Sequence, residues 1–275
     1  MMQQAVRDEI RFGFGENWRA FVANIDDDRI REAEKSLLSL LGLQRLEGKS
    51  LLDIGSGSGL FSLAARRMGA RVHSFDFDRA SVDCTTSLRE RYRPGDPEWT
   101  VEHGSVLDPN YMRRFASFDI VYSWGVLHHT GAMHEAIKQA ATRVKLDGLF
   151  AFALYRKTRL CWAWTIEKRW YTQASPAAQR WARAVYMAAL RAACLVSGRS
   201  YAAHIANYRS NRGMDFHHDL HDWMGGYPYE SITPAEVETA MNGLGFRHLR
   251  SVVRPFEFGV FGSGCDEYCY QRIGS

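Results

Sequence analysis

Paired cysteines are the first feature that this sequence lacks. It has five cysteines in 275 residues, an odd number, and no two of them have Cys-x-x-Cys spacing. Disulfide frameworks and structural zinc sites are built from paired cysteines, so neither is expected to hold this fold together. The pattern predicts free, buried thiols in a reducing compartment.

Long hydrophobic runs are also missing. The most apolar helical stretch, residues 184–196, is interrupted by Arg191 and is too short to span a bilayer. Neither end of the sequence shows a basic segment followed by an apolar, cleavable run. We therefore expect a cytoplasmic protein with no transmembrane segment, and peripheral contact with a membrane surface stays open.

Acidic residues are nearly absent from one part of the chain. Residues 156–212 contain eleven lysines and arginines and one acid, Glu167, so this segment carries +10 and the rest of the chain −6 of the net +4. The segment reads as helical and is rich in alanine and tryptophan. Three interpretations are open: a lid over an anionic substrate, a surface for RNA or acidic lipid, or a solvated helical face without a partner.

What the sequence does contain is a run of alternating glycines between an apolar strand pattern and a helical pattern. Residues 51–54 fit a buried parallel strand, and Gly55, Gly57 and Gly59 permit a tight turn that approaches a ligand closely. No lysine follows as in a P-loop, so hydrolysis of nucleoside triphosphates is not expected. Asp53 precedes the glycines, where it would repel a pyrophosphate and favour a cationic or zwitterionic ligand.

A second acid stands at the end of the next strand pattern. Residues 71–76 read as a strand that ends in Asp76, about 20 residues after the glycines. At this distance an open α/β sheet presents a carboxylate to ribose hydroxyls. Asp76 is therefore the candidate for binding a ribose.

Together these residues resemble motif I and the second-strand acid of class I S-adenosylmethionine-dependent methyltransferases. Residues 101–108 resemble the third-strand segment that frames the adenine in this family, and residues 118–129 the fourth strand and its loop. Residues 136–153 resemble the following helix, turn and fifth strand. The resemblance covers residues 48–155 closely and the ends of the chain loosely.

The resemblance implies an α/β fold and a division of the chain. It implies a Rossmann-like, seven-stranded sheet of order 3-2-1-4-5-7-6, with the last strand antiparallel, flanked by helices and with a helical insertion after strand five. The expected parts are an N-terminal helical cap at 1–48, the methyltransferase core at 49–155 and 225–275, and a helical lid at 156–224.

The resemblance also implies S-adenosylmethionine as cofactor, with S-adenosylhomocysteine as product. Asp53 and the three glycines would shape the methionine side of the site, and Asp76 would hold the ribose. The full set of cofactor-binding candidates is Asp53, Gly55, Gly57, Gly59, Asp76, Ser105, Val106 and Trp124. Many family members have an acid where Ser105 stands, so adenine contacts are expected from backbone amides and Ser105.

Two groups of histidines are candidates for a general base. His128 and His129 follow strand four, at the edge of the sheet that borders the ligand, although one of them can instead cap a helix. His218 and His221 lie in a cluster of histidines and aspartates at 215–222. That cluster could form a substrate wall, a solvated loop or a metal site, since His221 shares a helical face with neighbours. We adopt the substrate wall and assign no metal.

The remaining candidates concern the methyl acceptor. The substrate-site candidates are Phe14, Trp18, Asp222, Tyr227 and Glu267. The predicted function is transfer of a methyl group to a small-molecule, lipid-linked or sugar-linked acceptor. The expected acceptor atom is oxygen, and an anionic acceptor is one option. The alternatives are an RNA methyltransferase that uses the basic segment, and a non-catalytic partner protein that binds the cofactor.

Overall fold

The computed structural model describes residues 10–23, 25–203, 205–206, 216–253 and 264–274. These residues form two compact units. The larger unit contains residues 13–158, 230–253 and 264–274, and the smaller contains residues 10–12 and 159–229, each with the gaps given above.

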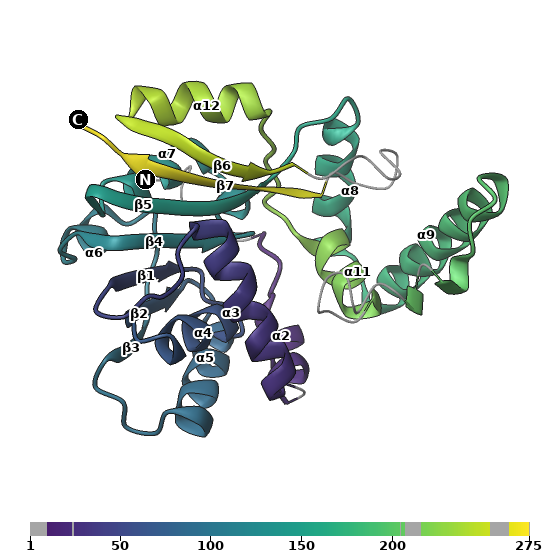
Figure 1. The fold of residues 1–275 in the computed structure, drawn as a ribbon. Helices are drawn as coiled ribbons and strands as arrows, with labels where there is room; N and C mark the ends of the chain where they lie inside the picture. Colours follow the sequence, from purple (N-terminus) through teal and green to yellow (C-terminus); the bar gives the residue numbers. More distant parts are fainter. Residues whose placement is uncertain (1–9, 24, 204, 207–215, 254–263, 275) are drawn as a thin grey trace. The chain divides into compact units, whose positions relative to one another are not determined.

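The larger unit is built on one seven-stranded sheet (Figure 1). Its strands are β1 (Ser50–Ile54), β2 (Arg71–Asp76), β3 (Trp99–His103), β4 (Phe118–Trp124), β5 (Val144–Tyr155), β6 (Phe246–Val252) and β7 (Cys265–Arg272). The order is β3-β2-β1-β4-β5-β7-β6, with the first five strands parallel and β7 antiparallel to both neighbours. The predicted sheet order and its antiparallel last strand are confirmed.

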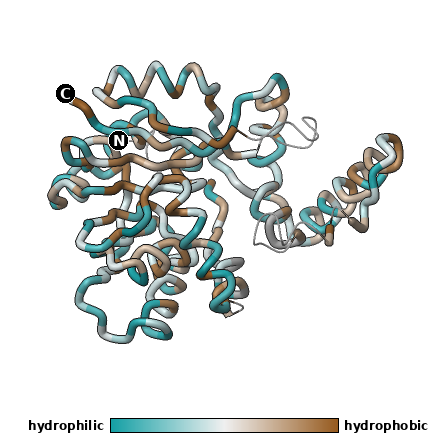
Figure 2. The backbone as a smooth tube through the Cα atoms, viewed as in Figure 1, coloured by the Kyte–Doolittle hydropathy of each residue, from teal (hydrophilic) through white to brown (hydrophobic). Residues whose placement is uncertain are grey.

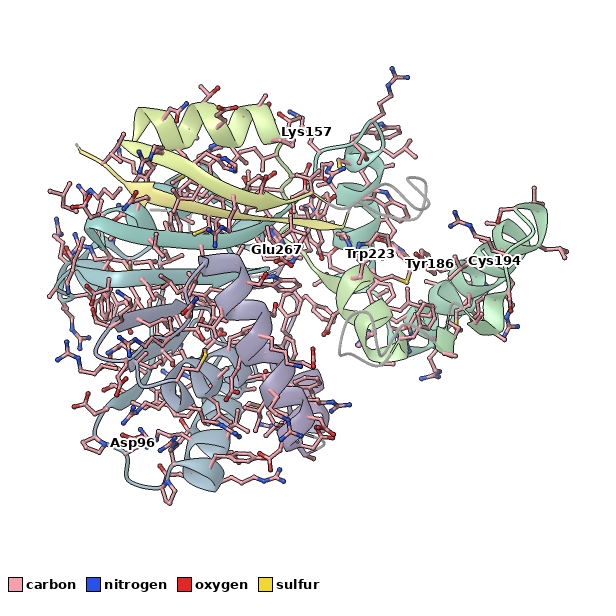
Figure 3. The ribbon with its side chains drawn as sticks, in the orientation of Figure 1. Asp96, Lys157, Tyr186, Cys194, Trp223 and Glu267 are labelled. Carbon is pink, nitrogen blue, oxygen red and sulfur yellow. The ribbon has the colours of Figure 1, made fainter. Side chains whose placement is uncertain are left out.

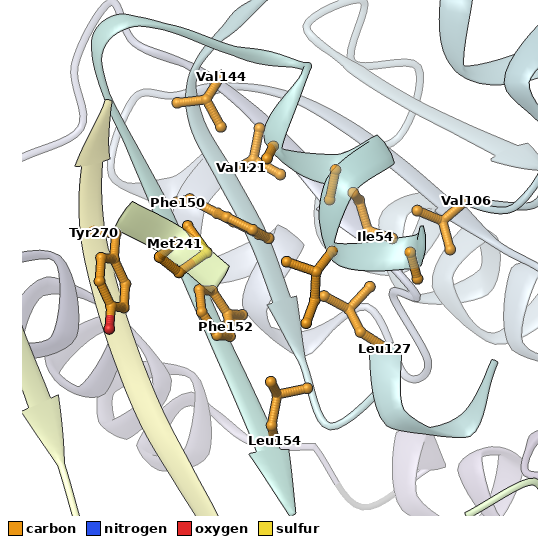
Figure 4. Close-up of a cluster of buried hydrophobic side chains, with 14 of the residues drawn as sticks. Ile54, Val106, Val121, Leu127, Val144, Phe150, Phe152, Leu154, Met241 and Tyr270 are labelled. Carbon is orange, nitrogen blue, oxygen red and sulfur yellow. The ribbon is translucent and has the colours of Figure 1, made fainter. Parts of the chain in front are cut away.

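Helices cover both faces of this sheet. They are α2 (Gly15–Ala23), α3 (Asp27–Leu41), α4 (Leu60–Arg67), α5 (Arg79–Tyr92), α6 (Pro109–Arg113), the 3-10 turn η1 (Leu127–His129), α7 (Met133–Ala141) and α12 (Pro234–Gly243). Side chains of β1 alternate between the two faces: Leu51 packs with α3, α4 and α5, whereas Leu52 and Ile54 pack with α7 and α12. Figure 4 shows the second of these clusters, around Phe150 and Phe152.

Local signals explain where several helices begin and end. The Thr233 hydroxyl accepts a hydrogen bond from the Glu236 backbone N–H, and the Glu236 carboxylate accepts one from the Thr233 N–H. This capping box, with Pro234 in the first turn, starts α12. The helix ends at Gly243.

The smaller unit is helical, and its elements are α8 (Cys161–Gln173), α9 (Pro176–Val196) and α11 (Phe216–Gly225). Its core brings together buried side chains of all three helices, including Tyr171, Leu190 and Phe216. Tyr186 of α9 and Trp223 of α11 lie with ring centroids 5.5 Å apart (Figure 3). A helical segment follows strand five as expected, while its assignment as a lid at 156–224 stays a prediction.

Two further expectations concern the whole chain. All five cysteines are free and buried, as the sequence predicts. Within the described residues, no helix is both long enough and apolar enough to cross a membrane.

Candidate active site

The glycine-rich turn joins β1 to α4 at the carboxyl end of the central strands. Gly55, Gly57 and Gly59 all have positive φ angles, of 78°, 54° and 79°, which side-chain-bearing residues rarely adopt. Close neighbours add a second requirement, because a Cβ on Gly55 would lie 2.4 Å from the Val126 side chain and one on Gly57 would lie 3.2 Å from the Trp18 ring. The loop after β4 and helix α2 therefore both pack against this turn.

Asp76 lies beside the central glycine. Its carboxylate accepts hydrogen bonds from the Gly57 N–H (2.9 Å) and from the Asp78 N–H (2.9 Å). Burial raises the pKa of Asp76 to about 6, against these two bonds. The predicted ribose acid is thus fixed at the glycine turn by two backbone donors, one from each flanking loop.

Asp53 is buried inside the larger unit. Its carboxylate accepts a hydrogen bond from the Ser62 hydroxyl (2.5 Å), which in turn contacts the Ser74 hydroxyl (2.7 Å), and the Trp99 indole N–H donates to Ser74. Burial raises the pKa of Asp53 to about 7, and the charge of Asp76 adds to the shift. An acid whose pKa is raised by burial and by the charge of a second acid nearby favours a ligand that brings positive charge.

The adenine candidates lie in the loop after β3. The Gly104 N–H donates to the Asp76 carbonyl (3.0 Å), so this loop runs beside the second-strand acid. The Ser105 hydroxyl accepts from the Leu107 N–H (3.2 Å), and Val106 is buried in the core cluster with Ile54. Ser105 therefore shapes the loop, and its contact with adenine stays a prediction.

The two histidines after β4 differ in burial. His128 is fully buried, its Nδ1 accepts a hydrogen bond from the Tyr155 N–H (3.3 Å), and its carbonyl accepts one from the Glu230 N–H. His129 is partly exposed, and its ring lies 5.1 Å from that of Phe14 and 5.4 Å from that of Tyr155. Of the pair, His129 is therefore the one whose ring can reach a ligand.

A row of paired residues brings two further candidates onto one face of the sheet. Trp124 of β4 pairs with Ala153 of β5, which pairs with Glu267 of β7. Residues paired across neighbouring strands point to the same face, so the small Ala153 separates Trp124 from Glu267. Tyr122 and Asp53 share this face one step back, and burial followed by the charges of Asp53 and Glu267 raises the pKa of Tyr122 well above its usual range.

The candidates of the second histidine cluster lie in the smaller unit. The side chain of His218 is outside the described residues. The Nδ1 of His221 lies 2.7 Å from the Tyr171 hydroxyl and 2.9 Å from Nη1 of Arg183, and the His221 ring packs edge-on against Phe12. Since guanidinium N–H groups only donate, Nδ1 of His221 accepts from Arg183.

Asp222 and Tyr227 extend this group. Asp222 is buried, and the Tyr227 carbonyl accepts a hydrogen bond from the Phe12 N–H (3.0 Å). In the part of the chain that the structure describes, no three His, Cys, Asp or Glu side chains gather as a metal site requires. Roles in acceptor binding for His218, His221, Asp222 and Tyr227 stay predictions.

Two residues at the glycine-rich turn, Asp78 and Thr85, are not among the candidates that the sequence offered. Asp78 caps α5 and accepts a hydrogen bond from the Gly15 N–H (2.8 Å), while the Thr85 hydroxyl contacts Ser56 (2.9 Å) and the Gly57 carbonyl (3.2 Å). An aspartate before a helical pattern was a visible cap signal at Asp78. Nothing in the sequence marked Thr85, because its partners come from another element.

A strand order of this kind, with a glycine-rich turn after β1 and an acid at the end of β2, defines class I S-adenosylmethionine-dependent methyltransferases. A family model described as a methyltransferase domain matches residues 25–208, which is more than half of the chain. The chain belongs to this methyltransferase domain family.

Curated relatives match less than half of the chain. Ubiquinone biosynthesis O-methyltransferases from Paramagnetospirillum magneticum and from a Methylobacterium species are 32% and 30% identical to the chain, over 127 and 132 residues. These matches cover 44% and 46% of the chain, and the chain spans about half the length of these relatives, 46% and 49%.

A solved structure is similar along the whole chain. Magnesium protoporphyrin IX methyltransferase from Synechocystis PCC 6803, with bound SAH (S-adenosylhomocysteine), superposes with a TM-score of 0.58 at 14% identity. The match covers 98% of the chain and 99% of that protein. At this identity, the likeness shows a shared fold.

The residues at the turn fit S-adenosylmethionine. This molecule has a positively charged sulfonium and amino group, a ribose diol and an adenine. Asp76 is held by two backbone N–H groups but keeps oxygen lone pairs for hydroxyl donors, because a carboxylate has about four acceptor positions. Asp53 adds a second carboxylate nearby. The three atoms nearest to the position of a Cβ on Gly57 all belong to the Trp18 ring.

Proposed function

We propose that this protein transfers a methyl group from S-adenosylmethionine to a hydroxyl oxygen of a small-molecule or lipid-linked acceptor. The observation that carries the proposal is the hydrogen bond from the Gly57 N–H to the Asp76 carboxylate, 2.9 Å long, near the buried Asp53. The names of the curated relatives, which are O-methyltransferases, favour oxygen as the acceptor atom.

The chain's own part in the reaction is binding, alignment and removal of a proton. Bound S-adenosylmethionine supplies an electrophilic methyl group. Holding a nucleophile in line with it accounts for about 7–11 kcal/mol of the barrier in favourable cases, so alignment is the main requirement. Asp53, Asp76 and the glycine turn hold the donor side, and Trp124 and Glu267 lie on the sheet face that continues from Asp53.

His129 is proposed as the base that takes the acceptor's hydroxyl proton. The ring is partly exposed and lies between the aromatic rings of Phe14 and Tyr155, which limit its orientations. His128 would position this turn, because it is buried and its carbonyl and Nδ1 both accept backbone hydrogen bonds. A base of this kind accelerates the reaction by about 10²–10⁴-fold.

The test is transfer of radiolabelled methyl groups from S-adenosylmethionine to phenols and catechols, with and without a lipid tail. We expect His129→Ala to lower turnover by about 100-fold or more while binding of S-adenosylhomocysteine stays unchanged. His134→Ala, which removes an exposed histidine of α7, is the matched control. Equal turnover by wild type and His129→Ala would remove His129 from the reaction.

The same assay separates the two alternatives. Methylation of RNA but of no small molecule would favour an RNA methyltransferase, whose binding would fall steeply with salt because counterions are released. Cofactor binding with no transfer to any acceptor in a cell extract would favour a non-catalytic binding protein.

A further inference from the structure

The exposed face of α9 is apolar. Between residues 180 and 196 the exposed side chains belong to tryptophan, alanine, valine, leucine and two arginines only. Trp181, Leu195 and Val196 are 65%, 82% and 89% exposed. Figure 2 shows brown, hydrophobic turns recurring along this helix. A surface helix of a soluble domain normally exposes charged and polar residues, so we expect this apolar face to contact a partner.

The opposite face of the same helix is already used. Ala182, Leu190 and Cys194 are buried in the core of the smaller unit, with Tyr186 packed beside them. At 100° per residue, the exposed apolar positions cluster on the other side of α9, and Arg180 and Arg191 lie together along one edge of that cluster. The helix therefore has one apolar face toward its own core and a second, bordered by arginines, toward solvent.

Helix α8 repeats the pattern. Trp162, Ile166 and Trp170 are spaced four residues apart, share one face, and are 67%, 64% and 46% exposed. Arg169 is exposed beside them, whereas Lys168 and Tyr171 on the other side of the helix are buried.

The charge of this surface has one sign. Within residues 159–203 and 205–206, every exposed charged side chain is an arginine. The one acid there, Glu167, has both carboxylate oxygens buried. Burial raises the pKa of Glu167 to about 7, so this one acid offsets the arginines only in part at neutral pH.

We propose that the exposed faces of α8 and α9 form a basic, amphipathic surface that binds anionic lipid membranes peripherally. Indole and aliphatic side chains enter the boundary between headgroups and acyl chains, while the arginines stay at the level of the lipid phosphates. Aromatic residues beside arginine suit this interface because one end is apolar and the other is wet.

Two other occupants fit the surface less well. A second copy of the same surface would bring arginines against arginines. Residues 159–203 and 205–206 contain no exposed acid that could pair with them. Single-stranded RNA stacks its bases on aromatic rings, which leaves the exposed Ile166, Leu195 and Val196 without a role. Lipid accounts for the aliphatic residues, the tryptophans and the arginines together.

The experiment is co-sedimentation of the full chain with vesicles of pure phosphatidylcholine or of phosphatidylcholine with about one third phosphatidylglycerol. We expect binding to the anionic vesicles only, and weaker binding in high salt because the headgroup charge is screened. The same samples are analysed by sedimentation velocity without lipid and by binding to single-stranded RNA.

Two pairs of substitutions test the two parts of the surface. Trp181→Ser with Leu195→Ser removes apolar contact, and Arg180→Gln with Arg191→Gln removes charge. Each pair should weaken vesicle binding by at least about tenfold. The matched controls are Leu146→Ser, which alters a leucine 66% exposed in the larger unit, and Arg45→Gln with Arg71→Gln, which alters two exposed arginines there.

Each outcome decides the proposal. Selective loss of vesicle binding in the two α9 variants, with unchanged thermal unfolding and binding of S-adenosylhomocysteine, supports it. Equal losses in the control variants would overturn it, as would no binding of the wild type to anionic vesicles. Self-association abolished by Trp181→Ser with Leu195→Ser, or RNA binding without vesicle binding, would assign the surface to those partners instead.

Discussion

Two acids beside one turn, the buried Asp53 and the partly buried Asp76, are the residues that most define this site. Asp53 and Asp76 would each be ionised in the unfolded chain at neutral pH, yet burial raises their pKa values to about 7 and about 6. The folded protein therefore takes up protons that the unfolded chain does not hold. Such an arrangement lowers stability, and a ligand with positive charge at the turn would offset the loss.

This reasoning predicts the effect of Asp53→Asn on stability. The pKa of Asp53 rises from 3.8 to about 7 on folding, so its contribution to stability falls as pH rises from about 4 to about 7 and then levels off. Asparagine keeps an acceptor for Ser62 and does not titrate. The variant should gain stability over wild type between pH 5 and pH 8, on the order of 1–3 kcal/mol, measured by urea unfolding without cofactor.

Asp119→Asn is a control whose effect on stability should have the opposite sign. Hydrogen bonds from Ser50 and from Lys145 lower the pKa of Asp119 to about 2 despite partial burial. Its stabilising effect is present at neutral pH and is lost only as pH falls toward 2, so its removal should destabilise the protein at pH 8. A gain from Asp53→Asn that did not depend on pH would contradict the account of Asp53.

The sequence predicted these residues because their spacing is local. Asp53 and the glycines fall within one short strand and turn, and Asp76 ends the next strand. The chain of bonds from Asp53 through Ser62 and Ser74 to Trp99 was out of reach, since those residues lie on four elements. The difference in burial between His128 and His129 was also hidden, because adjacent side chains in a turn have no fixed periodicity.

At the scale of the element, helix α2 begins at a close contact with α5. The Gly15 N–H donates to Asp78 (2.8 Å) where α5 begins, and a Cβ on Gly15 would lie 2.4 Å from the Ala80 Cβ. Trp18, one turn further along α2, covers Gly57 of the glycine-rich turn. The docking of α2 is therefore coupled to the glycine-rich turn.

Gly15→Val should displace α2 and with it Trp18. We expect the affinity for S-adenosylhomocysteine to fall by about tenfold, equivalent to about 1.4 kcal/mol, and the N-terminal segment to be cleaved faster by protease. Gly13→Val is the matched control, because no atom lies within 4 Å of the position of its Cβ. Equal effects of the two substitutions would mean that the contact with α5 does not hold α2 in place.

The capping box of α12 gives a second prediction at this scale. Thr233→Ala removes the side-chain acceptor for the Glu236 N–H, and chemical denaturation should show a loss of about 1 kcal/mol. Thr239→Ala provides the comparison, because the Thr239 hydroxyl bonds the Ala235 carbonyl within the same helix and caps nothing. A loss no larger than that of Thr239→Ala would show that the box contributes little.

Helix and strand limits were predictable where a local signal marked them. Helix α3 begins at Asp27 after the Asp26 cap and ends before Gly42, which has a left-handed conformation. The strand predicted at residues 71–76 is β2 with the same limits, and the strand predicted at residues 51–54 is β1, which begins one residue earlier. The sheet order itself came from resemblance to a family, because register between distant strands leaves no mark on a single sequence.

At the scale of the whole molecule, the candidate site and the basic segment lie mainly in different units. The acids and glycines of the candidate site lie in the larger unit, and the basic segment forms most of the smaller one. The presence of a basic, helical segment after residue 156 followed from the change in composition there. The use of the basic segment did not, because the sequence could not tell which tryptophans and aliphatic residues would be exposed.

The central claim is that the glycine-rich turn and Asp76 bind the cofactor of a methyltransferase. The most direct test is calorimetric titration of the ligand-free protein with S-adenosylhomocysteine and with NAD, beside Asp76→Asn and a control, Asp83→Asn, which alters an exposed acid of α5. The account predicts micromolar affinity for S-adenosylhomocysteine, about −8 kcal/mol, unchanged in Asp83→Asn and at least about tenfold weaker in Asp76→Asn. Binding of NAD instead, no binding by folded protein, or full affinity in Asp76→Asn would contradict it.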